Sequence, residues 1–196
     1  MTVWSTFGRR WVALPSASAA GPILKSYFDT LYVALTGDQT VAGVKTFSSN
    51  PVVSGGGIVF PGTQVPSAGV NTLDDYEEGT FTPVITGGTS GGAGTYSLQQ
   101  GTYTKIGNRV FIQISITWTA HTGTGDMLIT GLPFTCGGGT ALAFSNSLLT
   151  YTSHPTAFVQ FGTTQISIGE SASNAARTAI PIEAGADLRL AGAYAV

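Results

Sequence analysis

The sequence predicts a mainly β protein. We expect a C-terminal antiparallel β-sandwich of jelly-roll-like form, preceded by an extended arm, a short helix and an intertwined β segment. Residues 110–118 (VFIQISITW) alternate between apolar and mostly polar side chains, as a strand with one buried face does. Short strand-like runs separated by turns follow from residue 80 onward, and no helical pattern alternates with them, which disfavours a parallel βαβ fold. Only 9% of the residues are charged, against about 25% in an ordinary soluble domain, so we also expect an oligomer.

Residues 1–21 are predicted to form an extended arm. Two arginines precede a short apolar run, but Pro15 ends that run after four residues, whereas a secretory signal needs about 7–15. Tryptophan is enriched among the residues that anchor protein interfaces. The arm is therefore either a docking segment that orders on a larger assembly or a disordered tail with incidental aromatics. The candidate docking residues are Trp4, Phe7, Trp11 and Leu14.

Residues 22–36 are predicted to form a short helix. Pro22 suits a first helical turn, and Gly37 suits the position after a helix end. A helix of this length is marginal alone in water, so its apolar seam needs a partner, either copies of the chain or its own domain. The seam residues are spaced 4, 3 and 4 apart and are Leu24, Phe28, Leu31 and Leu35.

Residues 37–74 are predicted to form an intertwined connector. Val41, Val44 and Phe47 recur every three residues, which fits neither a helix face nor a simple strand. Glycine and proline interrupt the segment every few residues. Such a segment cannot build its own core, so another chain is expected to cover its apolar side chains.

Residues 75–196 are predicted to form the β-domain. Residues 101–106 should pair with the alternating strand across the Gly107-Asn108 turn, because this dipeptide favours a two-residue hairpin loop. Further strands are expected at 80–86, 127–131, 140–145, 147–151, 157–161, 164–169, 178–182 and 188–195.

Four blocks of the chain resemble bacteriophage tail proteins. LTGDQTVAGVKTFSS (35–49) resembles a connector that recurs in phage tail fibres, and NTLDDYEEGTFTPVI (71–85) resembles the lead-in to a small β-domain of phage structural and tail proteins. GTYTKIGNRVFIQISITWT (101–119) and HTGTGDMLITGLPF (121–134) resemble the body of that domain. The blocks occur in one order and cover about a third of the chain; the N-terminal 34 residues carry no such resemblance.

This resemblance implies a homotrimeric tail fibre or tail-tip protein of the virion. Its N-terminus would attach to other tail or baseplate proteins, and its β-domain would face outward to contact the host, for example a cell-surface glycan. A capsid head fibre or decoration protein with a purely structural role is the alternative. A capsule depolymerase is a further alternative, but the sequence has no repeat of 20–30 residues of the kind that builds a long β-helical groove.

The run DDYEEGTFTP (74–83) concentrates four of the ten acidic residues. Known calcium loops space their ligands at alternate positions around a turn glycine, which this run does not do. Paired glycosidase acids must face each other across a sugar, which neighbours in one short segment rarely manage. We interpret the run as a solvated domain boundary that Tyr76 tethers to a neighbour.

Five residues in or beside expected turns are candidates for host contact, because sugar sites combine aromatic faces with a few polar groups. They are Trp118, His121, Asn146, Tyr151 and His154. Trp118 ends the inward-facing row of its strand and is also a core candidate. The two histidines are interpreted as structural, with a shared metal site as the alternative.

No enzymatic activity, cofactor or metal is expected. The sequence has no nucleophile-elbow Gly-x-Ser-x-Gly, and Cys136 is its single cysteine, which excludes an internal disulfide. A net charge of −2 with scattered basic residues gives no electrostatic basis for nucleic-acid binding. No run approaches the roughly 18 apolar residues of a membrane span.

Overall fold

The structure is a computed structural model, and it describes residues 3–7, 10–14, 42–53, 55–63, 69, 71–73 and 75–196. The chain divides into two units, Met1–Gly57 and Ile58–Val196. Among the described residues, none belongs to a helix long and apolar enough to cross a membrane.

The first unit contains a hairpin. β1 (Val3–Phe7) pairs antiparallel with β2 (Arg10–Leu14), and Val3 lies opposite Leu14. A paired hairpin therefore lies within the segment that we expected to be extended. The helix predicted over 22–36, with its seam of Leu24, Phe28, Leu31 and Leu35, lies outside the described residues and stays a prediction.

The connector leaves its apolar side chains uncovered. Residues 42–53 and 55–63 form neither helix nor strand, so the β segment expected at 37–74 is absent from the described part of the single chain. Val44 is 95% exposed and Phe47 is 67% exposed. Val52 and Val59 are also almost fully exposed. This exposure agrees with the expectation that the connector cannot bury its own apolar residues.

The second unit holds the β-domain, which is mainly β as predicted. Its strands are β3 (Tyr76–Phe81), β4 (Val84–Gly87), β5 (Gly94–Ile106), β6 (Arg109–His121), β7 (Met127–Thr130), β8 (Thr140–Ser147), β9 (His154–Val159), β10 (Gln165–Ser171), β11 (Thr178–Ala179) and β12 (Ala186–Ala195).

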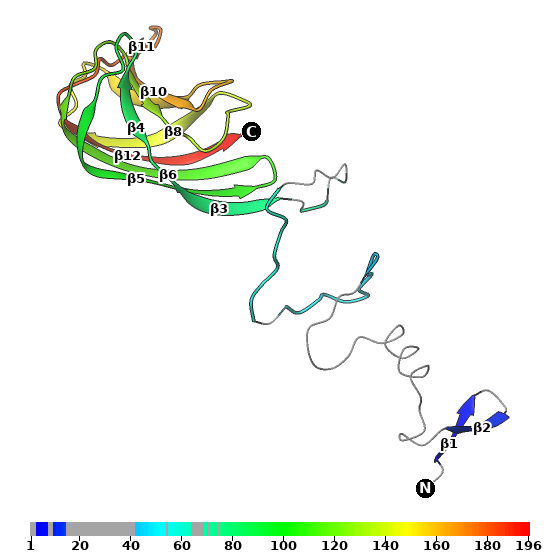
Figure 1. Ribbon diagram of the computed structural model, residues 1–196. Coiled ribbons are helices and arrows are strands. Elements are labelled where there is room, and N and C mark those ends of the chain that lie inside the picture. Colours follow the sequence, from blue (N-terminus) through cyan, green and yellow to red (C-terminus); the bar gives the residue numbers. More distant parts are fainter. Residues whose placement is uncertain are drawn as a thin grey trace. The chain divides into compact units, whose positions relative to one another are not determined.

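These strands form one antiparallel sheet that curls into a half-barrel (Figure 1). The order is β3-β5-β6-β12-β8-β9-β10-β7-β4, with β11 paired to β10. Two separate sheets, as in the predicted sandwich, are not found, because β8 pairs with both β12 and β9 and so joins the two halves. The antiparallel prediction is confirmed, and the sandwich is corrected to a single curled sheet.

The predicted hairpin is present. β5 and β6 pair over their length, with Ile106 opposite Arg109 across the Gly107-Asn108 turn. Gly107 has φ = 55°, a left-handed conformation that glycine adopts without a steric penalty. The even-numbered residues of β6 from Val110 to Trp118 are all buried, as their alternation predicts.

Two predicted strands are wrong. Residues 80–86 divide between β3 and β4, which lie at opposite ends of the sheet order. Residues 147–151 do not form a strand: β8 ends at Ser147, and the next residue, Leu148, has φ = 61°. A positive φ is incompatible with an extended strand. β5 begins at Gly94, so residues 94–100 belong to a strand that was predicted only from residue 101.

The core lies on the inner face of the curled sheet. It contains the buried rows of β6, β10 and β12 together with single residues from the other strands, and includes Ile85, Ile114, Ile116, Met127, Ile129, Val159, Ile166, Ile168, Leu188, Leu190 and Tyr194. Each buried branched or aromatic side chain contributes about 1.5–3 kcal/mol of hydrophobic free energy. The β-domain, unlike the connector, thus has an interior of its own.

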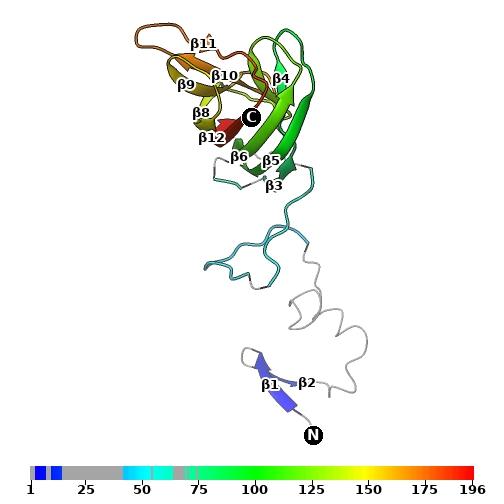
Figure 2. The same ribbon diagram turned by 90° about the vertical axis from the view of Figure 1, so that its left-hand side faces the viewer.

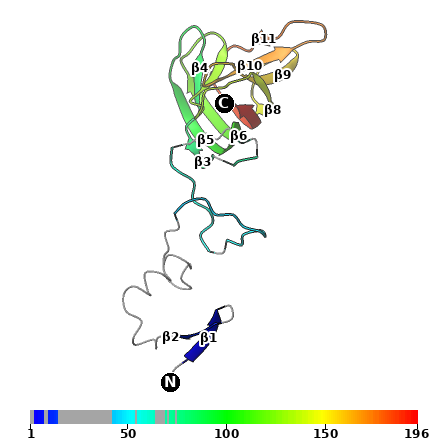
Figure 3. The ribbon, with the colours of Figure 1, turned by 90° about the vertical axis from the view of Figure 1, so that its right-hand side faces the viewer.

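Side chains close the sheet where β4 comes round to β5. The Tyr96 hydroxyl accepts a hydrogen bond from the Ile85 N–H (2.9 Å) and donates to the Ile85 carbonyl (3.4 Å). Gln99 Nε2 donates to the Pro83 carbonyl at 2.8 Å. A register shift between Tyr96 and Leu98 lets both β5 side chains face β4. Figure 2 and Figure 3 view this curled sheet from two opposite sides.

Candidate attachment surface

The strand registers define two ends of the β-domain. The proximal end carries Asp75, where the chain enters β3, together with the Gly107-Asn108 turn and the 160–164 turn. The distal end carries the loops at 88–93, 122–126, 148–153 and 172–177. All five sequence-predicted contact residues lie toward the distal end, opposite the end where the chain enters β3 at Asp75.

Trp118 is a core residue and is corrected as a contact candidate. Its side chain is 2% exposed, and its Nε1 donates a hydrogen bond to the Glu183 carbonyl at 3.0 Å. The indole therefore has no face available to a sugar. Its position at the end of the inward row already indicated this outcome.

His121 has a structural role in the closure of the sheet. The Gly123 N–H donates to its Nδ1 at 2.9 Å, so the proton of the neutral ring lies on Nε2. Nε2 lies 3.0 Å from the carbonyl of Ile85 and donates to it. Both ring nitrogens are used within the domain, and the half-buried ring offers neither to a ligand or a metal.

Asn146 and His154 lie on opposite faces of the sheet. Alternation along β8 places Asn146 on the inner face with the buried Leu142. Alternation along β9 places His154 on the outer face, since Ala157 and Val159 point inward. The structure therefore does not combine these two residues in one site.

Tyr151 lies on a distal loop, 148–153, that two carboxylates hold in place. Glu170 accepts hydrogen bonds from the N–H groups of Thr152 (2.6 Å) and Ser153 (2.7 Å). These two donors, that of Ser153 foremost, lower the pKa of Glu170. Glu183 accepts a hydrogen bond from the Thr150 N–H at 2.6 Å. These hydrogen bonds order the backbone of the loop, while Tyr151 remains 43% exposed.

Leu148 is a feature of this loop that the sequence did not reveal. It is 82% exposed, and its φ of 61° is uncommon for a residue other than glycine, asparagine or aspartate. Strained backbone of this kind occurs where surrounding structure imposes it. The exposed side chains of Leu148 and Tyr151, above the buried Leu149, form the distal tip, which is defined here as residues 148–153.

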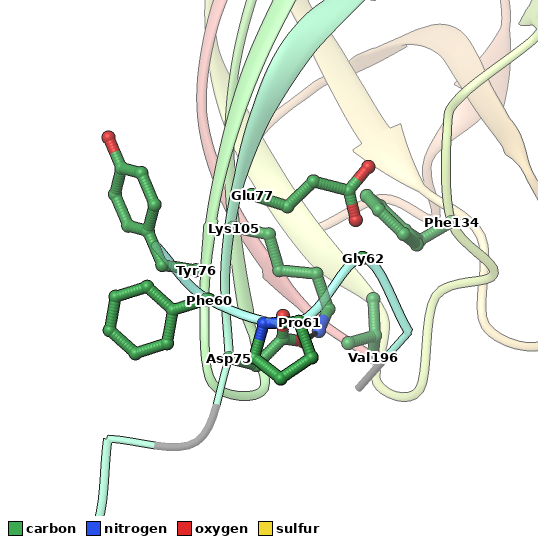
Figure 4. A pocket seen from close by; sticks show the side chains of 9 residues that line it. All are labelled: Phe60, Pro61, Gly62, Asp75, Tyr76, Glu77, Lys105, Phe134 and Val196. Carbon is green, nitrogen blue, oxygen red and sulfur yellow. Dashed lines mark ion pairs between the residues drawn. The ribbon is translucent and has the colours of Figure 1, made fainter. Parts of the chain in front are cut away.

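A cavity of about 440 Å³ lies at the proximal end (Figure 4). Asp75 and Lys105 form a buried ion pair in its wall, and Phe60 and Phe134 supply aromatic surface. The acidic run is therefore not only a solvated boundary, because Asp75 is buried against β5. Its neighbour Glu77 accepts a hydrogen bond from the Tyr103 hydroxyl, which raises the pKa of that tyrosine.

The outer face of β5, β6, β12 and β8 is broad and almost neutral. It carries hollows of about 290, 240 and 200 Å³, and Gln113 lines all three. Their other outward residues include hydroxyls, amides and small side chains, namely Gln100, Thr102, Thr104, Ser115, Ala143, Ser145 and Ala191. The charged Arg189 also lines one hollow and forms an ion pair with Asp187. Phe111 stands exposed among them.

The described residues contain no cluster of three His, Cys, Asp or Glu side chains that could hold a metal ion. Asp75 and Asp187 form ion pairs, and Glu170 and Glu183 accept backbone hydrogen bonds. The arrangement at the distal tip suits non-covalent contact by an aromatic ring and an aliphatic side chain.

Comparisons with known proteins find a similar solved fold for part of the chain. No protein-family model matches the sequence, and no curated protein matches it. The crystal structure of the Dettilon tailspike protein is similar, with a TM-score of 0.51 and 19% sequence identity. The similarity covers 61% of this chain and 24% of the tailspike chain. At this identity it shows a shared fold over that part.

Proposed function

We propose that this chain is a subunit of a phage tail appendage, a homotrimeric fibre or tail-tip protein without enzymatic activity. Its N-terminal residues, with Trp4 and Trp11, dock on the tail or baseplate, and the connector ties three chains together. The β-domain then faces outward and contacts the host surface. A tail location is supported by the four tail-protein-like blocks and by the fold that the β-domain shares with part of a tailspike.

The distal tip is the proposed contact surface for a host glycan. One observation carries this proposal: the loop exposes the side chains of Leu148 and Tyr151, while its backbone N–H groups are hydrogen-bonded to Glu170 and Glu183. Because the loop is already ordered, binding does not have to order it, which reduces the entropic cost. Three copies in one fibre would combine weak single contacts into strong attachment.

Binding of the full-length chain to host cells tests the proposed contact surface. Tyr151→Ala is expected to reduce cell binding at least tenfold, because one aromatic anchor is lost in each of three copies. Phe161→Ala is the matched control, since Phe161 is an exposed aromatic residue in the proximal 160–164 turn. Equal binding by both variants and the unmodified protein would contradict the proposed tip.

The alternative function is a capsid head fibre or decoration subunit. The broad neutral outer face of the β-domain favours it, because a surface with few charges suits packing against other proteins. Antibody against residues 75–196, applied to intact particles, separates the two functions. Labelling of the tail is expected; labelling of the capsid would favour the alternative.

A further inference from the structure

The β-domain has a free sheet edge. β3 is the terminal strand in the sheet order, and among the described residues it pairs only with β5. Figure 1 shows β3 at the margin of the curled sheet. An exposed edge strand presents unpaired N–H and C=O groups and is a template for another strand.

The register identifies which backbone groups face this edge. The Gly107 N–H donates to the Asp75 carbonyl at 3.0 Å, so Asp75 points its backbone groups toward β5. Backbone direction alternates along an antiparallel strand. The N–H and C=O groups of Tyr76, Glu78 and Thr80 therefore point to the free edge.

The connector contains a segment that matches this edge in charge and shape. Val44 and Phe47 are exposed, and no described residue of the same chain covers them. Lys45 carries the only charge among the described connector residues 42–53 and 55–63, and the facing strand carries Glu77 and Glu78. An exposed basic and aromatic segment and an acidic edge with an exposed tyrosine are therefore present in one sequence.

We propose that residues 44–48 of one copy add to β3 of a second copy as an antiparallel strand. The proposed register sets Lys45 opposite Glu78 and Phe47 opposite Tyr76. Both pairs would lie on the outer face, since Tyr76 and Glu78 lie opposite Ile106 and Thr104. Opposite-charge pairs and aromatic pairs directly across two strands stabilise a sheet.

The surroundings of β3 suit this register. Phe60 lies beside Tyr76, with ring centroids 6.1 Å apart, so Phe47 would extend an existing aromatic contact (Figure 4). On the inner side, Val44 would face Gly79, which has no side chain, next to the Tyr103 ring. The second copy is the proposed occupant because the apolar residues of the connector remain uncovered in a single chain. This inference rests on the proposed oligomeric fibre and names one contact that would hold it together.

Disulfide trapping in the full-length chain tests the register. In the proposed register, Thr46 and Glu77 lie opposite each other as a non-hydrogen-bonded pair, with Cα atoms about 4.5 Å apart. A disulfide spans Cα separations of roughly 4.4–6.8 Å, so this pair can be bridged. Chains that carry Thr46→Cys and one affinity tag are co-expressed with chains that carry Glu77→Cys and a different tag. The purified mixture is then oxidised in air. A covalent product carrying both tags is expected on a non-reducing gel. Cys136 is fully buried and can stay in place.

Two controls make the trapping specific. Lys45→Cys with Glu77→Cys shifts the register by one residue and turns the new thiol to the opposite face, so no product is expected. Lys45→Glu should reduce trapping by the first pair, because it places like charges opposite each other, and adding Glu78→Lys should restore it. Equal trapping by the shifted pair would overturn the register.

Light scattering on the same samples separates this inference from the proposed function. An oligomer that gives no product with Thr46→Cys and Glu77→Cys would overturn the β3 contact and leave the fibre proposal standing. A monomer that gives no product would overturn both.

Discussion

Asp75 and Lys105 form an ion pair with both side chains buried at the point where the chain enters the β-domain. Asp75 directly precedes β3, and Lys105 lies on the inner face of β5 above Phe134, with its Nζ 5.6 Å from the ring centroid. The pair therefore fixes the connector end of β3 to the sheet.

Removal of one partner is expected to be costly. Asp75→Ala leaves the Lys105 ammonium buried without a counter-ion, and loss of one member of a buried pair costs about 3–5 kcal/mol. The double variant Asp75→Leu with Lys105→Met removes both charges and should recover most of that loss. Urea unfolding of the three proteins measures it. A single variant as stable as the unmodified protein would show that the pair is not buried in solution.

The closure between β4 and β5 depends on Tyr96. Tyr96→Phe removes the hydroxyl that bonds both backbone groups of Ile85, and we expect a loss of about 1–3 kcal/mol in unfolding free energy, because a buried N–H is left without a partner. Tyr151→Phe is the control, since the exposed Tyr151 hydroxyl has no hydrogen bond to a described residue, and it should change stability by less than about 0.5 kcal/mol. Equal unfolding midpoints in urea would contradict this account of the closure.

The distal tip should lose its order in acid. The N–H groups of Ser153 and Thr152 lower the pKa of Glu170 in the folded protein. The Glu170 carboxylate therefore stabilises the loop fully at a pH above the pKa that this group has in the unfolded chain. The stabilisation is lost as the pH falls through the lowered folded pKa. Protection of the Thr152 and Ser153 amides from hydrogen exchange, taken relative to the intrinsic exchange rate at each pH, should persist down to the ordinary carboxyl range and decrease below it.

Glu170→Gln is expected to speed exchange at Thr152 and Ser153 already at neutral pH. Glu183→Gln should affect Thr150 instead, because its carboxylate accepts from that N–H alone. Unchanged exchange in both variants would show that the carboxylates do not order the loop.

Tyr194 should resist ionisation. Burial raises its pKa to about 12, and its hydroxyl donates to the Phe134 carbonyl at 3.0 Å. The raised folded pKa means that its stabilising effect is complete below the unfolded value of about 10 and is lost as pH rises toward 12. Ultraviolet titration of phenolate should show a step near pH 12 that disappears in Tyr194→Phe. Ionisation of every tyrosine near pH 10 in the folded protein would contradict this burial.

Local patterns were sufficient to predict the strands with the clearest alternation. The inward row from Val110 to Trp118 and the Gly107-Asn108 turn follow from period-two hydrophobicity and turn chemistry. The run after Ser147 misled the prediction because Thr150 and Tyr151 favour strands, while Leu148 takes a positive φ that composition does not reveal.

Long-range pairing set the limits of the site prediction. Asp75 looked like part of a solvated acidic run because Lys105, its partner, is thirty residues away and meets it only through the β3–β5 register. His121 looked available because its bonds to Ile85 and Gly123 depend on β4 closing against β5. Tyr151 was identified from its turn-like surroundings, but Glu170 and Glu183, which order its loop, carry no local signal.

The mass of the full-length chain in solution tests the central claim, that the exposed connector needs sister chains. Multi-angle light scattering at micromolar concentration should give three times the mass of one 20.1 kDa chain. A single-chain mass at that concentration, with a cooperative unfolding transition that includes the connector, would contradict the account.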